Sequence, residues 1–265
     1  MTSLVRHRLT PDQAGPALRA LSEWTPEDVP AGGVHPGDIG WYLRFDDAVV
    51  HLWTADGTPV AAGFLDGKAL RVTTAPGAGV EAIAADAEEL LAPDERRTDG
   101  LPMPGFRREL EDPWAVLSWT PRPVAATRAE FVDAGSAADR VLVQRSAFPG
   151  STFTVERWHA MKRSPAGDLA VETLVRTPEG APAAAVTGWF AGEGRCALLE
   201  PVGTHPDHRG HGYGREAVLA ACAALAERGA SAVAVVTPKS LTPAVALYRS
   251  AGFTLVRENH DWVAA

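Results

Sequence analysis

The chain has 265 residues, of which 46% are hydrophobic, 22% charged and 7% aromatic. This composition is typical of a globular protein with a substantial core, and it excludes a disordered or collagen-like chain. At roughly 150 residues per domain, the length predicts one large domain or two small ones. The formal net charge of −8 argues against a general nucleic-acid-binding protein, because neutralising phosphates needs clustered cations. It mildly favours a cationic small-molecule or peptide substrate.

Signals for disulfides, export and membrane insertion are missing from the sequence. The two cysteines, Cys196 and Cys222, are far apart and have no paired histidine motif, which argues against a disulfide framework or a structural zinc site. The polar start of the chain does not resemble a signal peptide. No run reaches the ~18 apolar residues that span a bilayer. We therefore expect a soluble, cytoplasmic protein that contacts neither membrane nor nucleic acid.

The first half of the chain is predicted to contain a helix, a meander of strands and a second helix. Apolar residues at helical spacing predict the first helix at residues 11–22 and the second at 80–91. The Pro/Gly-rich stretch 26–40 is predicted to be a loop, and 98–113 a linker. Hairpin signals separate three strand-like runs, at 49–54, 60–65 and 69–73.

The second half repeats this order of elements. An apolar run at 114–119 is followed by helical segments within 128–161 and by strands at 169–176, 183–190 and 196–204. A helix at about 212–228, a strand at 232–236, a helix at 243–251 and strands at 253–256 and 261–263 complete the chain. Thr242 is the expected N-cap of the last helix, and Gly252 its end. The pattern predicts an α/β (α+β) fold of two similar domains, each with a central mixed sheet flanked by helices.

The segment from Cys196 to Gly214 is the most informative part of the sequence. It runs from an apolar strand through a glycine-rich turn that begins at Arg209, and then directly into a long amphipathic helix. Gly210, Gly212 and Gly214 allow the backbone to approach a ligand closely. The free N–H groups at the start of a helix, reinforced by the helix dipole, bind anions. A diphosphate is the natural occupant of such a turn.

A glycine-rich turn by itself has other interpretations. A plain connection between a strand and a helix stays open on the turn alone. A Rossmann dinucleotide site is disfavoured, because hairpins precede the turn and no acidic residue ends a parallel second strand. A Walker loop is excluded, because no Gly-Lys-Ser/Thr follows.

Two motifs follow one another in the second half of the chain. The first, Arg209-x-x-Gly-x-Gly, is preceded by Val-x-Thr-x-Pro, and the second reads Ala244-x-x-Leu-Tyr248-x-x-x-Gly-Phe253. Together they resemble the GNAT superfamily of N-acetyltransferases, over about residues 124–265. The resemblance implies that the first motif holds the pyrophosphate of acetyl-CoA, as a co-substrate and without a metal. The residues implied to bind it are Val202, Gly203, Thr204, Arg209, Gly210, His211, Gly212, Tyr213 and Gly214.

The first half resembles the family in its order of elements alone. At the corresponding place, residues 72–80 read Val-Thr-Thr-Ala-Pro-Gly-Ala-Gly-Val, with no arginine. We therefore expect a degenerate GNAT-like domain at residues 1–112 that does not bind CoA, followed by a catalytic GNAT domain at residues 113–265.

Pro201 lies inside a predicted central strand, where a proline removes a ladder hydrogen bond. The resemblance implies that this strand splays away from its parallel neighbour and that the pantetheine arm of the cofactor fills the gap. The backbone of Val202, Gly203 and Thr204 would then pair with the arm as with an added strand. A simple bulge at Pro201 would give the same kink without a ligand.

Acetyl transfer from a thioester to an amine needs a neutral amine, a stabilised oxyanion and a proton for the leaving thiolate. Backbone N–H groups near Val202 and Gly203 are candidates to polarise the thioester carbonyl. The resemblance implies that Tyr248 is the general acid, whereas its helix face alone would indicate a core tyrosine. Glu200 is the candidate base, since it shares a strand face with Val202. Binding a cationic acceptor is an equally weighted role for this carboxylate.

One position departs from the family pattern. Leu241 stands where many members carry an Asn whose amide contacts the cofactor. Ser240 and Thr242 are the candidate replacements for that contact.

Histidine and tryptophan side chains near the motifs have structural interpretations. His205, His208 and His211 recur every third residue, but they lie in the proposed phosphate loop, so surface or phosphate-facing roles are favoured over metal ligation. Trp158 and Trp189 are candidates for the wall of a substrate pocket, although aromatic residues in such places usually belong to the core.

The expected function is acetyl-CoA-dependent N-acetylation of a primary amine of a small molecule, an antibiotic or metabolite, by direct attack in a ternary complex. The acceptor is expected to bind at residues 148–158 and in the cleft between the halves. N-acetylation of a protein and transfer of a larger acyl group stay open. So does a non-catalytic acyl-CoA-binding sensor or assembly module, against which the joint presence of Arg209 and Tyr248 counts. The sequence also leaves a homodimer open.

Overall fold

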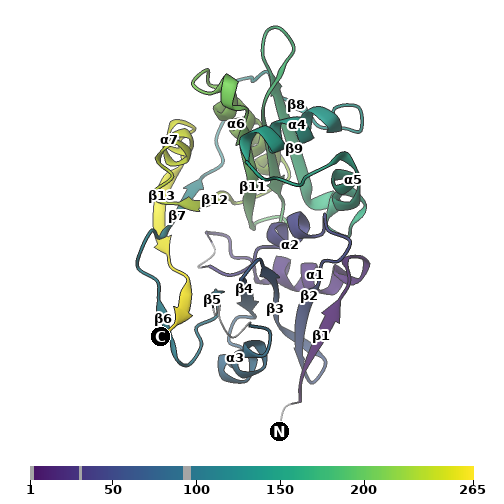
Figure 1. Cartoon of the computed structure of the whole chain (residues 1–265), viewed down its shortest axis with the longest axis vertical. Coiled ribbons are helices and arrows are strands. Elements are labelled where there is room, and N and C mark those ends of the chain that lie inside the picture. Colours follow the sequence, from purple (N-terminus) through teal and green to yellow (C-terminus); the bar gives the residue numbers. More distant parts are fainter. Residues whose placement is uncertain (1–2, 30–31, 92–96) are drawn as a thin grey trace.

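The structure is a computed structural model of the chain and describes residues 3–29, 32–91 and 97–265. This described part contains two seven-stranded mixed sheets, one centred on each half of the chain, with helices against them (Figure 1). The predicted fold class, an α/β fold with two mixed sheets flanked by helices, is confirmed. No helix among the described residues has the length and apolar character needed to cross a membrane.

The first sheet has the strand order β1-β2-β3-β4-β5-β14-β6. Its antiparallel meander is followed by a parallel pair, β4 and β5, and a helix, α3, follows β4 along the chain. The elements of this half are β1 (Leu4–Leu9), a 3-10 turn (Pro11–Gln13), α1 (Gly15–Trp24), α2 (Pro36–Tyr42), β2 (Val50–Ala55), β3 (Thr58–Asp66), β4 (Ala69–Thr74), α3 (Val80–Glu88), β5 (Arg97–Asp99) and β6 (Phe106–Arg108).

Two predictions for this half were wrong. The stretch 26–40 was predicted to be a loop, but it leads into α2, which is closed at its start by side chains. The Gly37 N–H donates to His35 Nδ1 (2.9 Å), and the His35 N–H donates to Asp38 Oδ2 (2.6 Å). The stretch 98–113 was predicted to be a linker, but it carries β5 and β6. These strands are too short to show a hydrophobic period, so only pairing with other strands reveals them.

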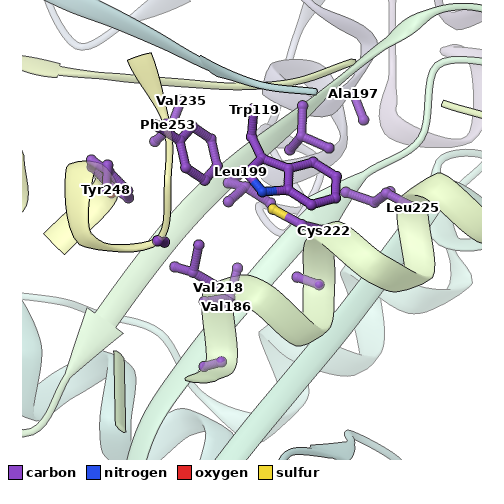
Figure 2. Packing of buried hydrophobic residues seen from close by; sticks show 14 of the residues in the cluster. Trp119, Val186, Ala197, Leu199, Val218, Cys222, Leu225, Val235, Tyr248 and Phe253 are labelled. Atoms are coloured by element: carbon purple, nitrogen blue, oxygen red, sulfur yellow. The ribbon is translucent and has the colours of Figure 1, made fainter. Parts of the chain in front are cut away.

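The second sheet has the order β8-β9-β10-β11-β12-β7-β13. Its core lies between the sheet and α6, where Figure 2 shows Trp119, Leu199 and Val235 near Val218 and Cys222 of the helix. The elements are β7 (Trp114–Trp119), β8 (Glu130–Phe131), α4 (Ala137–Ala147), α5 (Val155–Arg163), β9 (Ala170–Arg176), β10 (Pro182–Trp189), β11 (Cys196–Thr204), α6 (Tyr213–Glu227), β12 (Ala232–Pro238), α7 (Thr242–Ser250), β13 (Thr254–Asn259) and β14 (Trp262–Ala264), with 3-10 turns at Gly167–Leu169 and Pro206–His208.

One strand of the second half belongs to the first sheet. β7, the first strand of the second half, stays in the second sheet, between β12 and β13. β14, at the end of the chain, returns to the first sheet and lies between β5 and β6 (Figure 1). A boundary between residues 112 and 113 therefore separates the sheets except for β14, whose strand was expected in the second domain.

The two halves also share one hydrophobic core. Helix α2 of the first half packs on the indole of Trp189, so closely that a Cβ at Gly37 or Gly40 would overlap the ring. His35 Nδ1 accepts a hydrogen bond, so Nε2 carries the proton and donates it to the carbonyl oxygen of Cys196 (3.0 Å) in β11. Trp158 and Trp189 belong to this shared core rather than to a pocket wall.

Candidate active site

Strands β11 and β12 separate part-way along their length. Their parallel pairing covers Cys196–Leu198 against Ala232–Ala234 and goes no further. From Leu199 to Thr204, β11 keeps β10 on one edge, with a register shift between Leu199 and Val202, while its other edge is open. Pro201 lies in this open stretch, where its missing N–H leaves no gap in a ladder between β11 and β12. The structure thus places an unpaired strand edge where the sequence predicts a splay.

A cavity of about 970 Å³ extends from this opening to the first half of the chain. Glu200, Val202 and Tyr248 from the second half line it. The predicted acceptor segment lines it only at residues 148–153, because residues beyond Phe153 enter α5, whose Trp158 is in the shared core. The first half contributes Asp38, Trp41, Arg44, Asp66, Lys68, Arg71 and Asp99, none of which the sequence indicated.

Tyr248 lies on the face of α7 that turns towards β11. Its side chain is 5% exposed and packs against Phe253, with ring centroids 5.8 Å apart (Figure 2). Burial, together with the charge of Glu200, raises the pKa of its phenol above the usual value of 10. The phenol therefore keeps its proton through the neutral pH range. Helix α7 begins at Thr242 and not after it, so its N-cap is Leu241, which offers no side-chain oxygen.

Glu200 meets Asp38, a carboxyl group from the other half of the chain. Asp38 is 4% exposed, and its Oδ1 lies 2.8 Å from Nη1 of Arg71. Burial alone would raise the pKa of Asp38, but the Arg71 guanidinium and a hydrogen bond with Glu200 outweigh it, and this pKa is lowered. Burial and the Asp38 charge raise the pKa of Glu200 well above its usual value. Of the two carboxyl groups, Glu200 is therefore the one that binds a proton more tightly.

This proton decides what Glu200 offers to a ligand. While it holds a proton, its carboxyl group is neutral and acts as a donor. A general-base role requires that Glu200 first loses this proton. An incoming ammonium group favours that loss, because a nearby cation lowers the pKa of a carboxyl group.

The glycine-rich turn lies at the far end of the open edge. Gly210 (φ +83°) and Gly212 (φ +85°) occupy the left-handed region, and a Cβ at either would meet nothing within 4 Å. Gly214 is needed for a different reason, since its Cβ would lie 2.6 Å from Thr204 Oγ1. No side chain caps the start of α6, so its first N–H groups are available to a ligand. Arg209 is exposed beside them, with Nε 3.4 Å from the carbonyl oxygen of Thr204.

Aromatic rings cover the outer side of this turn. His211 stacks on Tyr213 with centroids 5.9 Å apart, and His208 meets the same ring edge-on at 6.4 Å. Tyr213 is buried and belongs to the core cluster under the turn. Within the described ranges, no three His, Cys, Asp or Glu side chains are grouped to hold a metal ion.

The candidate replacements for the missing Asn differ in their surroundings. The Ser240 hydroxyl donates to Asp112 Oδ2 (2.6 Å), and the Ser240 N–H donates to Asp112 Oδ1 (2.8 Å). Thr242 is exposed, and Leu241 is exposed at the rim of the cavity. Ser240 is therefore occupied by the segment that connects the two sheets.

Comparisons with known proteins agree with this geometry. The sequence pattern of the acetyltransferase (GNAT) family matches residues 141–253, which include the open edge, the turn and Tyr248. This match lies wholly in the second half of the chain. No curated protein matches the sequence significantly.

Solved structures show the same fold over nearly the whole chain. A tandem GNAT protein from the clavulanic acid biosynthesis pathway is 18% identical, with a TM-score of 0.59, and the match covers 99% of this chain and 98% of that one. An acetyltransferase of the GNAT family from Colwellia psychrerythraea is 11% identical (TM-score 0.56; 98% and 100% covered). A GCN5-related N-acetyltransferase from Sphaerobacter thermophilus is 20% identical (TM-score 0.52; 98% and 94% covered). At these identities the likeness shows the fold.

Proposed function

We propose that this protein is a GNAT-family, acetyl-CoA-dependent N-acetyltransferase whose acceptor is a primary amine of a small molecule. One observation carries the proposal. The open edge of β11 leads from the uncapped start of α6 into a cavity that holds both Glu200 and Tyr248.

The residues of the second half fit a pyrophosphate followed by an extended arm. Open space at Gly210 and Gly212 lets phosphate oxygens reach the N–H groups at the start of α6, and Arg209 adds a positive charge. The free edge at Val202, Gly203 and Thr204 offers backbone groups to the arm. Acetyl-CoA, when bound, supplies a thioester whose acetyl group passes to an amine.

The cavity residues provide for the proton movements of this reaction. Tyr248 keeps its proton to high pH, so it has one to give to a thiolate. Glu200 and Asp38 form a carboxyl pair that attracts an ammonium group and, once Glu200 is ionised, accepts a proton from it. Walls from both halves enclose this place, which favours a small acceptor over a folded protein.

The proposal is tested by calorimetry with acetyl-CoA and by thiol release from a panel of primary amines, followed by mass spectrometry of the products. We expect binding of acetyl-CoA and release of CoA with at least one amine. The Arg209→Ala variant should bind acetyl-CoA roughly tenfold more weakly, whereas Arg163→Ala, which removes an exposed arginine of α5 far from the turn, should bind it as the wild type does. Binding without turnover of any amine would instead indicate an acyl-CoA sensor, and no binding would overturn the proposal.

A further inference from the structure

Arg44 lies in the cavity on the first-half side, just after α2. Its guanidinium carbon is 4.1 Å from the ring centroid of Trp41 and 4.2 Å from that of Phe45. Nη1 donates to the carbonyl oxygen of Trp41. Aromatic stacking and this hydrogen bond hold the guanidinium in place while its other N–H groups stay available.

No carboxylate within the described ranges forms an ion pair with Arg44. Asp66 lines the same cavity, but it is exposed and pairs with Arg71 at 3.7 Å. Arg71 itself has Asp38 at 2.8 Å and Asp99 at 3.5 Å. Arg97, which also lines the cavity, pairs with Asp261 at 2.6 Å, so both of these guanidiniums are neutralised and Arg44 is not. Burial lowers the pKa of Arg44 to about 10, which leaves it charged at neutral pH. A half-buried charge without a partner costs free energy, which an anionic ligand would recover.

A second guanidinium stands beside it. Arg157 of α5 lies 4.8 Å from the ring centroid of Phe45, so both cations pack on the same aromatic ring. The Arg157 Nη1 donates to the carbonyl oxygen of Thr152 (2.6 Å), which is part of the cavity wall. Arg157 likewise has no ion pair among the residues that the structure describes. Two neighbouring cations in a protein of net charge −8 form a local anion site.

The same cavity contains both this cationic place and the carboxyl pair. Glu200 is near enough for its charge to raise the pKa of Arg44. Glu200 also lies on the stretch of β11 whose edge is open, where an amine would react. We propose that the acceptor carries an anionic group, a carboxylate or a phosphate; this inference rests on the proposed function. Its amine would lie beside Glu200 and Asp38, and its anion would lie on Arg44, with Arg157 behind it. Polycationic amines would be poor acceptors, because the two guanidiniums repel a second positive charge.

The test uses matched pairs of primary amines with the full-length protein and acetyl-CoA. Amino acids and dipeptides are compared with their carboxamides, and aminoalkyl phosphates with the corresponding alcohols; diamines and aminoglycosides complete the panel. We expect kcat/KM to be at least tenfold higher for the acidic member of one of these two series, which also identifies the anion. Equal kcat/KM for acidic and neutral members, or a preference for the polycations, would overturn the inference while leaving the acetyltransferase proposal intact.

Variants then connect the preference to the guanidinium. Arg44→Gln should raise KM for the acidic acceptor at least tenfold and leave KM for its neutral partner unchanged, and Arg44→Lys should restore part of the loss. Arg157→Gln should have the same effect in weaker form. Arg145→Gln, which removes an exposed arginine of α4, is the control and should match the wild type. If Arg44→Gln raised KM for acetyl-CoA instead, the guanidinium would belong to the cofactor's place, and the inference would be wrong.

Calorimetry separates this inference from the proposed function. The acidic members are titrated into the wild type and into Arg44→Gln without acetyl-CoA, so that no turnover is needed. Heat with the wild type that is lost in the variant supports the anion site even if no amine is acetylated. No heat with any acidic member of the panel overturns it.

Discussion

Three side chains from different parts of the chain set the protonation of the cavity. Glu200 binds a proton more tightly than Asp38 does, and Arg71 holds Asp38 in the ionised form. Tyr248 also lines the cavity, and burial raises the pKa of its phenol, so that the phenol stays protonated. The cavity therefore contains a proton donor, Tyr248, and a second group, Glu200, which can act as a base only after it loses a proton.

The Tyr248→Phe variant tests the donor. Phenylalanine keeps the packing against Phe253 and removes only the hydroxyl. We expect kcat for an amine acceptor to fall roughly 10²-fold, since general acid catalysis contributes about that much or more, while KM for acetyl-CoA stays unchanged. Tyr42→Phe, in the shared core, is the control. An undiminished kcat in Tyr248→Phe would reject the acid role.

Asp38→Asn tests the carboxyl pair through the pH dependence of kcat/KM. Removing the Asp38 charge and its hydrogen bond lowers the pKa of Glu200, and the remaining Arg71 charge lowers it further. The ascending limb of the profile should therefore move to lower pH. Asp66→Asn should move this limb in the same direction but less far, because the charge of Asp66 raises the pKa of Glu200 less than the charge of Asp38 does. Glu200→Gln should abolish this limb, and an unchanged limb in Glu200→Gln would rule out this residue as the base.

Two elements, β11 and α6, carry the proposed cofactor site. They are joined by the glycine-rich turn, in which Gly210 and Gly212 adopt a positive φ and Gly214 lets the start of α6 approach the end of β11. The close approach of Gly214 to Thr204 fixes the distance between the open strand edge and the uncapped helix start. The phosphates and the arm of one ligand require that distance to be constant.

Gly214→Ala should disturb this junction. The added methyl group would meet Thr204 Oγ1, so the helix start must move away from β11. We expect an increase in the Kd for acetyl-CoA of at least tenfold, measured by calorimetry, with a loss of stability of about 1–3 kcal/mol. Gly79→Ala is a matched control, since Gly79 stands at the start of helix α3 with φ −68° and has only Glu81 Oε2, at 4.0 Å, near the place of a Cβ. Wild-type affinity in Gly214→Ala would show that the close approach is not needed for binding.

At the scale of the whole molecule, the two halves are bound together by β14. This strand of the second half lies between β5 and β6 of the first sheet, and residues of both halves line the cavity. Asp261, just before β14, ties them further, since it accepts hydrogen bonds from Arg97 (2.6 Å) and from Trp114 Nε1 (3.1 Å). The first half therefore serves as a wall of the cavity as well as a scaffold.

Removal of residues 261–265 tests this connection. The truncated chain loses the pairing of β14 with β5 and β6 and both contacts of Asp261. We expect the Tm to fall by roughly 5 °C or more, which corresponds to about 2 kcal/mol in a chain of this size. Removal of Ala265 alone, which loses one hydrogen bond to Gly105, should have little effect. An unchanged Tm in the longer truncation would show that β14 does not stabilise the first sheet.

Much of the second half could be predicted from local patterns. The strand at 196–204 was predicted with the bounds of β11, and the helices at 212–228 and 243–251 within one residue, because apolar periodicity and glycine ends are written into adjacent residues. Helix α2 was missed, since its sequence is rich in Pro and Gly and the helix packs on Trp189, far away along the chain. β5 and β6 were missed because each has three residues and pairs with strands elsewhere, β5 with β4 and β14 and β6 with β14.

The sequence alone determined the glycine-rich turn, the long helix behind it and the two residues proposed for catalysis, because each depends on neighbours within a few positions. Only the tertiary structure decided that Asp38 and Arg71 control the proton on Glu200 and that Arg44 faces the same cavity. Those side chains lie in the other half of the chain, where no local pattern marks them. Charges act through space, so their effect on Glu200 exists only once the two halves have packed together.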